Sequence, residues 1–422
     1  MKIYKANIVY TQHPGSFDVL KGGCVAVEDG RVVGVASDAS HFAVPDAEVV
    51  DYGDCLLIPA MNDMHVHASQ YRNQGIAMDL ELLPWLANYT FPEEAKFASL
   101  SYADSVYRRF VRDLWRFGTM RCVTFATTHY EGSRRLMQLF QEAGMGALVG
   151  KVSMDRNSRP ELCESVADSV RHIEALAEEF GDPEGLVRPI VTPRFIPSCT
   201  PEMLRACGEL ARKYNLSVQS HLSENTDEIA FVRKLEPESR NYADAYLRYG
   251  LFGQQPTVMA HCVWPEDEEL QLLKENGVMV AHCPTSNLNV SSCMAPVRTF
   301  LDKGIRVGLG SDISGGHDLS IFRMMAYAVQ VSKMYGKYCG GAPFLTLPEV
   351  FWIATKSAGS FFGKVGSFEP GYEFDALVID DSALNYDNYT IVQRIERFIY
   401  LGDDRYITHR YCRGVEIPEP KV

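Results

Sequence analysis

Two histidines separated by one residue end an apolar segment near the start of the chain, in Asp63-Met-His65-Val-His67. Because alternate side chains of a β-strand point to the same face, His65 and His67 could bind one ion from one side. Imidazole pairs of this kind suit a transition metal. An isolated H-x-H pair also occurs as two unrelated surface histidines, so the rest of the sequence must decide.

Further apolar segments also end in side chains that bind metals, namely His221, His261, His282 and Asp312. Barrels of parallel βα units carry their chemistry at the carboxyl ends of the strands. Three imidazoles and one carboxylate with an open position form a catalytic site for Zn²⁺ or Fe²⁺, which brings the pKa of a bound water to about 7. The segment that ends at Phe195 offers no bridging lysine or carboxylate. The sequence therefore predicts a hydrolytic site with one metal ion.

Repeated βα units must position these residues. Eight short apolar runs alternate with helical patterns, which is typical of an α/β fold with a parallel sheet. The runs are Leu57–His67, Thr119–Thr127, Ala147–Met154, Val187–Phe195, Ser217–Leu222, Thr257–Val263, Val278–Pro284 and Arg306–Asp312. Eight runs favour a closed (β/α)₈ TIM barrel. A doubly wound open sheet is the alternative, but the glycine-rich fingerprint that usually follows its first strand is absent.

The two ends of the chain carry β patterns instead. Residues 1–58 contain several short β segments, and residues 364–422 contain three more, at Asp375–Asp380, Arg397–Leu401 and Tyr406–Arg413. We expect the two ends to combine into a small composite β-sandwich module. This module would lie beside a metal-dependent hydrolase barrel at residues 59–363.

The composition excludes several classes of protein. The chain has 422 residues with 41 Lys and Arg against 54 Asp and Glu, a formal charge of −13 that disfavours binding to nucleic acids or anionic membranes. No apolar run reaches the roughly 18 residues needed to span a bilayer, and the first residues lack a secretory signal, so we expect a cytoplasmic protein. The eleven cysteines contain no C-x-x-C pair and are expected to be reduced, with Cys262 and Cys283 pointing toward the helices.

The longer motifs resemble those of the amidohydrolase superfamily over nearly the whole chain. The shared motifs are Asp63-Met-His65-Val-His67, Ser220-His-Leu-Ser-Glu224, His261 and Ser311-Asp312. Within the superfamily, four sequence motifs are similar to those of the guanine deaminase branch. They are His67-Ala-Ser-Gln70-Tyr71, Leu83–Glu93, Thr192-Pro-Arg194-Phe195 and Leu401-Gly-Asp-Asp-Arg405.

This resemblance implies a homodimeric enzyme that converts guanine and water to xanthine and ammonia. It implies one zinc ion per subunit, with Fe²⁺ as the other possibility, bound by His65, His67, His221 and Asp312. Glu224, one helical turn past His221, and Asp312 would shuttle protons. His261 would stabilise the charge that builds up in the tetrahedral intermediate.

The resemblance also implies substrate contacts from Gln70, Arg194 and Phe195. The forked donors of Arg194 suit a carbonyl oxygen such as O6 of guanine, Gln70 offers a donor and an acceptor, and Phe195 offers an apolar face. Trp85 is included as a contact, although aromatic residues are more often packing residues.

Some features stay open at this point. His282 fits a hydrogen-bonded or structural role better than a fifth ligand, and His129 and His317 are covered by no motif. One rival is an aminohydrolase of the same superfamily that acts on another amino-purine, a pterin or a triazine. The other is a catalytically silent scaffold that binds metal.

Overall fold

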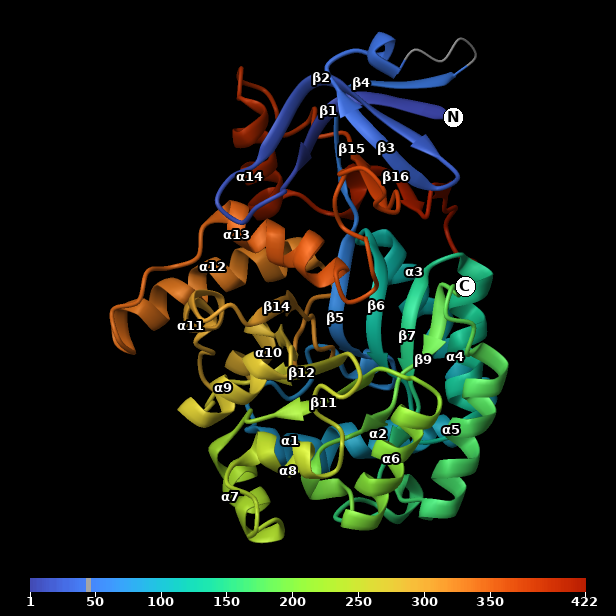
Figure 1. Ribbon diagram of the computed structural model, residues 1–422, viewed down its shortest axis with the longest axis vertical. Coiled ribbons are helices and arrows are strands. Elements are labelled where there is room, and N and C mark those ends of the chain that lie inside the picture. Colours follow the sequence, from blue (N-terminus) through green and yellow to red (C-terminus); the bar gives the residue numbers. More distant parts are fainter. Residues whose placement is uncertain (43–46) are drawn as a thin grey trace.

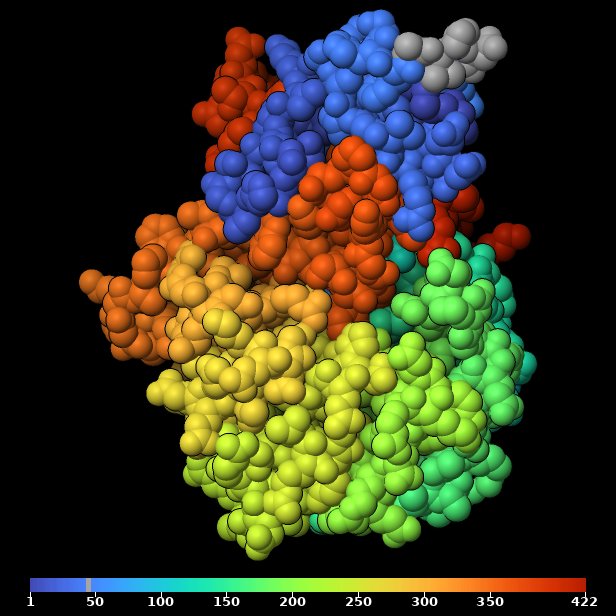
Figure 2. Space-filling model, in the orientation of Figure 1, coloured from blue at the N-terminus to red at the C-terminus, as the bar shows by residue number. Residues whose placement is uncertain are grey.

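The computed structural model describes residues 1–42 and 47–422. A seven-stranded sheet occupies one end of the molecule, and parallel sheets with surrounding helices form the rest (Figure 1). Figure 2 shows the blue N-terminal and red C-terminal segments gathered at that same end. Within the described residues, no helix has both the length and the apolar character needed to cross a membrane.

Both ends of the chain contribute to the seven-stranded sheet. Its order is β17-β16-β15-β4-β1-β2-β3, and β15 pairs antiparallel with β4. The strands are β1 (Lys2–Tyr10), β2 (Asp18–Glu28), β3 (Arg31–Ala36), β4 (Glu48–Pro59), β15 (Ala376–Ile379), β16 (Ile407–Cys412) and β17 (Val415–Glu416). The first and last segments of the chain therefore form one structural unit.

The strand predicted at Arg397–Leu401 is wrong, because these residues end helix α14 (Ile391–Leu401). Thr390 caps this helix in a capping box with Gln393, and the helix buries Ile395 and Phe398 on one face. A five-residue apolar run is compatible with either a strand or part of a helix. The capping box at Thr390 and the helical spacing of the buried residues favour the helix over the strand.

The central part of the chain forms two four-stranded parallel sheets and a short parallel pair. The first sheet contains β5 (Met61–His67), β6 (Thr119–Phe125), β7 (Gly146–Gly150) and β9 (Val187–Pro189). The second contains β11 (Val218–Leu222), β12 (Thr257–His261), β13 (Met279–His282) and β14 (Arg306–Leu309). The pair is β8 (Val152–Ser153) with β10 (Thr192–Pro193). The α/β class with parallel sheets is confirmed.

Backbone contacts connect the two parallel sheets at both sides. Val191, which follows β9, forms a parallel bridge with Val218 at the start of β11. After β14, the amide of Asp312 donates a hydrogen bond of 2.8 Å to the carbonyl of His65 on β5. The carboxyl ends of strands that are far apart in the sequence are thereby brought together.

Helices follow most of the parallel strands and bury one face each. In α3, Ser99 caps the N-terminus, and the buried Val106, Phe110 and Leu114 recur every four residues. The helices are α1 (Leu82–Trp85), α2 (Phe91–Ala95), α3 (Leu100–Arg116), α4 (Tyr130–Ala143), α5 (Val166–Phe180), α6 (Pro201–Lys213), α7 (Thr226–Leu235), α8 (Tyr242–Arg248), α9 (Asp267–Glu275), α10 (Pro284–Asn289), α11 (Val297–Asp302), α12 (Ile321–Tyr338) and α13 (Leu347–Trp352). Helices α1 and α2 lie at the end of the molecule opposite the seven-stranded sheet (Figure 1).

A buried ion-pair cluster joins the two parts of the molecule. Arg121 on β6 donates from Nε to Oδ2 of Asp375 and from Nη2 to Oε2 of Glu373, both at 2.5 Å. The Arg121 side chain is 4% exposed. Glu373 and Asp375 immediately precede β15, so this contact connects the terminal sheet to the parallel strands.

Candidate metal centre and binding pocket

Four of the predicted metal ligands converge at the carboxyl ends of the parallel strands. Strand β5 presents His65 and His67 on one face, β11 presents His221, and Asp312 follows β14. Oδ1 of Asp312 lies 3.1 Å from Nε2 of His65 and 3.3 Å from Nε2 of His67. Nε2 of His67 also lies 3.2 Å from Nε2 of His65 and 3.2 Å from Nε2 of His221. The four side chains therefore form one compact cluster, called the His/Asp cluster below.

This arrangement fits a metal cation. Nδ1 of His221 is 2.6 Å from the carbonyl of Arg194, which only accepts, so Nδ1 carries the hydrogen and the Nε2 lone pair faces the cluster. Ligands held about 2.0–2.2 Å from a tetrahedral zinc ion are about 3.3 Å apart, close to the distances found here. Converging lone pairs repel one another unless a cation lies between them. These residues therefore form a possible His/Asp metal site.

The protonation states also suit metal ligands. Burial lowers the pKa of His65, and it lowers the pKa of His67 and His221 well below the usual range, so these imidazoles are neutral. Burial alone would raise the pKa of Asp312, but the nearby imidazoles outweigh it and hold that pKa far below its usual value. The cluster thus offers three neutral nitrogen donors and one carboxylate, the forms that bind a metal.

His261 and Glu224 lie beside this cluster without joining the four ligands. Nε2 of His261 is 3.5 Å from Oε2 of Glu224 and 3.8 Å from Oδ2 of Asp312. Oδ1 of Asn287 accepts from Nδ1 of His261 at 2.9 Å, and Ser292 donates to Glu224 at 3.1 Å. Burial raises the pKa of Glu224 to about 7. Glu224 can therefore both hold and release a proton near neutral pH.

The predicted position of Glu224 one helical turn past His221 is wrong. Strand β11 ends at Leu222, and Glu224 lies in the loop before α7. Ser223 between them has a positive φ of 48°, and His261 and Asp312 have φ values of 73° and 46°. Non-glycine residues in this region are strained, and such strain is common where side chains must be aimed at a functional site.

A pocket next to the cluster brings together the predicted substrate contacts. Gln70, Arg194, Phe195 and Trp85 all line it. The same pocket is lined by His67, His221, Glu224, His261 and Asp312 and closed by the apolar Leu82, Leu86 and Val290. A planar ring in this pocket would lie against both polar groups and the metal site.

The remaining candidates are not brought into the cluster. His282 is buried with its pKa lowered to about 3 by burial, and its Nδ1 has no partner. His129 is half-buried, and His317 contacts Asn289 through Nδ1 at 3.0 Å. None of these three histidines belongs to a group of potential metal ligands within the described residues.

Cys283 does not point away from the site as predicted. Its sulfur lies within 4.8 Å of ligand atoms of His261 and Asp312. Burial raises the pKa of this thiol well above its usual value. The strand ends at His282, so alternation along the strand does not extend to Cys283.

Sequence reasoning missed several residues that support the site. Phe125 ends β6, and its ring centre is 4.5 Å from that of His67 and 4.9 Å from that of His221. Asn287 accepts a hydrogen bond from His261. Glu94 accepts hydrogen bonds from Gln70 and Arg194. Nothing local in the sequence marks them, because each acts on a residue that is distant along the chain.

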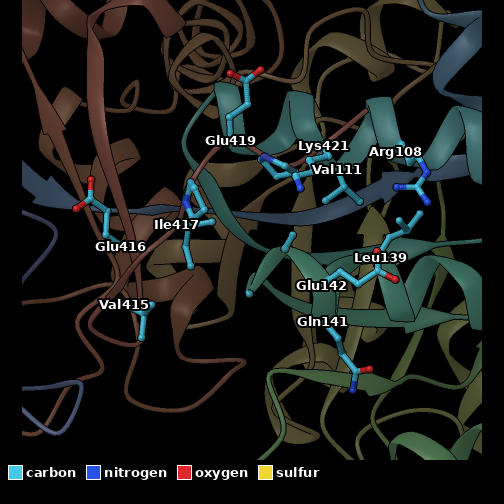
Figure 3. A pocket seen from close by; sticks show the side chains of 14 residues that line it. Arg108, Val111, Leu139, Gln141, Glu142, Val415, Glu416, Ile417, Glu419 and Lys421 are labelled. Carbon is cyan, nitrogen blue, oxygen red and sulfur yellow. The ribbon is translucent and has the colours of Figure 1, made fainter.

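A larger hollow lies elsewhere, between the C-terminal segment, the middle of α3 and the end of α4 (Figure 3). Its labelled charged side chains are Arg108, Glu142, Glu416, Glu419 and Lys421. It contains no histidine or cysteine and none of the predicted site residues. The metal chemistry is therefore assigned to the smaller pocket at the strand ends.

Comparison with known proteins agrees with this site. The amidohydrolase family matches residues 56–417. The guanine deaminase of Dictyostelium discoideum is 36% identical over 99% of this chain and 98% of its own, and that of Homo sapiens is 35% identical over 98% and 96%. A crystal structure of guanine deaminase from C. acetobutylicum with bound guanine has a TM-score of 0.96 and 48% identity, covering 99% of this chain and 100% of that one.

The family match and these full-length similarities agree with the cluster of imidazoles and carboxylate at the strand ends. The chain belongs to the amidohydrolase family.

Proposed function

We propose that this protein is a guanine deaminase, a hydrolase that converts guanine and water to xanthine and ammonia. The observation that carries the proposal is one pocket in which Arg194 and Gln70 adjoin the His/Asp cluster. The 48% identity to a deaminase crystallised with guanine supports the same substrate. Another aminohydrolase substrate is not favoured, because Gln70, Arg194 and Phe195 line the pocket. A silent scaffold is not favoured, because all four proposed ligands and Glu224 are present.

The proposed metal is a single zinc ion. Its proposed ligands are His65, His67, His221 and Asp312. When bound, this ion would lower the pKa of a water molecule so that hydroxide forms near neutral pH. Asp312 would accept the proton of that water. Fe²⁺ would suit the same ligands, and analysis of metal content in the purified protein distinguishes the two.

Glu224 and His261 complete the proton transfers. Attack at C2 of guanine forms a carbon–oxygen bond, and Glu224 delivers a proton to the adjacent ring nitrogen. Asp312 returns its proton to the exocyclic amine as the carbon–nitrogen bond breaks, which releases ammonia. The hydroxyl on C2 loses its proton to Glu224 as the new carbonyl forms, which restores both carboxyl groups. His261, oriented by Asn287, donates a hydrogen bond to the oxygen that develops negative charge.

Substrate recognition is assigned to Gln70, Arg194, Phe195 and Trp85. Arg194 donates to the O6 carbonyl, and Gln70 binds a polar edge of the ring. Phe195 and Trp85 supply apolar contact area. Adenine carries an amine where guanine carries O6 and cannot accept from Arg194.

The finer architecture is also a proposal. The two parallel sheets would be halves of one (β/α)₈ barrel at residues 59–363, which the backbone contacts at both of their sides support. The terminal sheet at 1–58 and 364–422 would bend into a β-sandwich, which the register shifts in β1 and β2 support.

Association into a homodimer would cover exposed apolar side chains near the end of α12. Met334, Tyr338 and Phe344 are 50%, 72% and 53% exposed. Sedimentation of the purified protein would test this assembly.

The proposed activity is tested by ammonia release from guanine, adenine, a pterin and melamine, with and without a chelator and added zinc. We expect metal-dependent release from guanine alone, matched by xanthine. Release from another ring but not from guanine would retain the metal site and refute the pocket assignment. If the zinc-loaded protein releases ammonia from none of these compounds, the result would favour a binding protein.

A further inference from the structure

Glu94 on α2 contacts both polar residues of the pocket at once. Its Oε1 accepts a hydrogen bond from Nε2 of Gln70 at 2.9 Å, and its Oε2 accepts one from Nη1 of Arg194 at 2.6 Å. The Glu94 side chain is 5% exposed. Glu94 does not line the pocket itself, so it acts on a ligand only through its two partners.

The contact with Glu94 determines which way the amide of Gln70 faces. A carboxylate only accepts, so the nitrogen of Gln70 must face Glu94. On the other side, Oε1 of Gln70 accepts from the backbone amide of Ser314 at 3.1 Å. Because both contacts require the same orientation, the amide cannot flip, and one N–H of Gln70 remains for a ligand.

Glu94 also balances the charge of Arg194. The Arg194 side chain is 4% exposed, and its guanidinium carbon lies 4.9 Å from the centre of the Phe91 ring. A buried cation without a partner is strongly disfavoured, and Glu94 supplies the opposite charge. The pair is neutral as a unit, which suits an uncharged purine, and the remaining donors of Arg194 are left for a carbonyl oxygen.

We propose that Glu94 is a positioning residue that holds Gln70 and Arg194 as paired donors for the oxo group of an oxopurine, and that it thereby determines substrate specificity. This inference rests on the proposed function. It predicts that loss of the Glu94 charge weakens recognition of the oxo group more than it affects the rest of the ring.

Glu93 provides a matched control on the same helix. Its side chain is 6% exposed, and Oε2 accepts from Lys96 at 2.5 Å, while Oε1 accepts from the hydroxyl of Tyr102. Glu93 contacts neither Gln70 nor Arg194. The Glu93→Gln substitution therefore removes a buried carboxylate of α2 without touching the pocket residues.

The experiment compares zinc-loaded parent, Glu94→Gln, Glu94→Asp and Glu93→Gln with guanine and with 2-aminopurine, as substrate or as competitive inhibitor. 2-Aminopurine carries the amine of guanine and lacks its oxo group. We expect Glu94→Gln to raise KM for guanine by about tenfold or more, as for loss of a hydrogen bond to a charged group. The preference for guanine over 2-aminopurine should fall by a similar factor, with metal content unchanged.

The other variants make the result decisive. Glu94→Asp keeps the charge and should retain more of the preference than Glu94→Gln, and it carries the test if Glu94→Gln does not fold. Glu93→Gln should change the preference by less than about twofold. An unchanged preference in the folded Glu94 variants would overturn this inference alone. A zinc-loaded parent that leaves guanine intact would overturn the proposed function, and the inference with it.

Discussion

The backbone carbonyl of Arg194 accepts a hydrogen bond of 2.6 Å from Nδ1 of His221. The same residue sends its side chain to Glu94 and the pocket. Arg194 thus connects a predicted metal ligand through its backbone with the substrate pocket through its side chain. Because the two roles use different atoms, substitution of the side chain can separate them.

Arg194→Met is expected to raise KM for guanine strongly or to abolish turnover while the metal remains bound. The carbonyl that orients His221 is retained, whereas the donors for O6 are lost. Steady-state kinetics and metal analysis of the same preparation measure both effects. Arg188→Met, on β9 and outside the pocket, should leave the kinetics unchanged. Wild-type guanine kinetics in Arg194→Met would refute the assignment.

Glu224→Gln is expected to retain the metal and to lose about 10²- to 10⁴-fold in turnover, as for loss of a general acid–base group. Glutamine has nearly the same shape but cannot carry the proton. Ser292→Ala removes only the hydroxyl that donates to Glu224 and should cost much less. Rapid turnover by a fully metal-loaded Glu224→Gln protein would remove Glu224 from the mechanism.

The ionisation of Glu224 is expected to make stability depend on pH. Burial raises its pKa from 4.5 to about 7, so the folded protein keeps a proton that the unfolded chain releases between these values. The contribution of Glu224 to stability therefore falls as pH rises through this window and stays low above it.

Glutamine at this position does not ionise. The stability advantage of Glu224→Gln over the parent should grow by up to about 3 kcal/mol across the window, at about 1.4 kcal/mol per pKa unit. Urea unfolding of the two metal-depleted proteins at several pH values measures the difference. A difference that stays constant with pH would contradict the raised pKa.

Arg121→Met is expected to lower the free energy of unfolding by about 3–5 kcal/mol, because it removes the buried guanidinium that pairs with the carboxylate of Asp375. Glu373 keeps its ion pairs with Arg31 and Arg413. Arg134→Met is the control, since Arg134 pairs with Glu179 at the surface with 37% and 35% of the side chains exposed. That change should cost no more than about 1 kcal/mol. If denaturant unfolding shows the same loss of stability for Arg121→Met and Arg134→Met, Arg121 does not stabilise the contact between the terminal sheet and the parallel strands.

Local patterns were enough to predict most of the side chains of the His/Asp cluster. The spacing of His65 and His67 sets both rings on one face of β5, which needs no tertiary information beyond the strand itself. The positions of His221 and Asp312 after apolar runs predict the same end of a parallel sheet. The resemblance to the amidohydrolase superfamily added the proton shuttle and the pocket residues.

Local patterns were insufficient where a short segment admits two structures. The run Arg397–Leu401 has apolar residues that suit a strand, and only its place at the end of a capped helix shows otherwise. The offset of three positions from His221 to Glu224 suits one helical turn, but the chain leaves β11 through a strained loop first. Cys283 was placed by alternation that stops one residue earlier.

The sequence by itself determined the imidazole and carboxylate groups of the cluster, the alternation of strands and helices, and the β character of both ends. Only the tertiary structure decided how Glu94 acts, since its partners lie 24 residues before it and 100 residues after it. It likewise decided that Asn287 orients His261 and that Arg194 orients His221. The physical reason is that strand periodicity is a local property, whereas hydrogen bonds between side chains at different strand ends depend on how the strands are brought together.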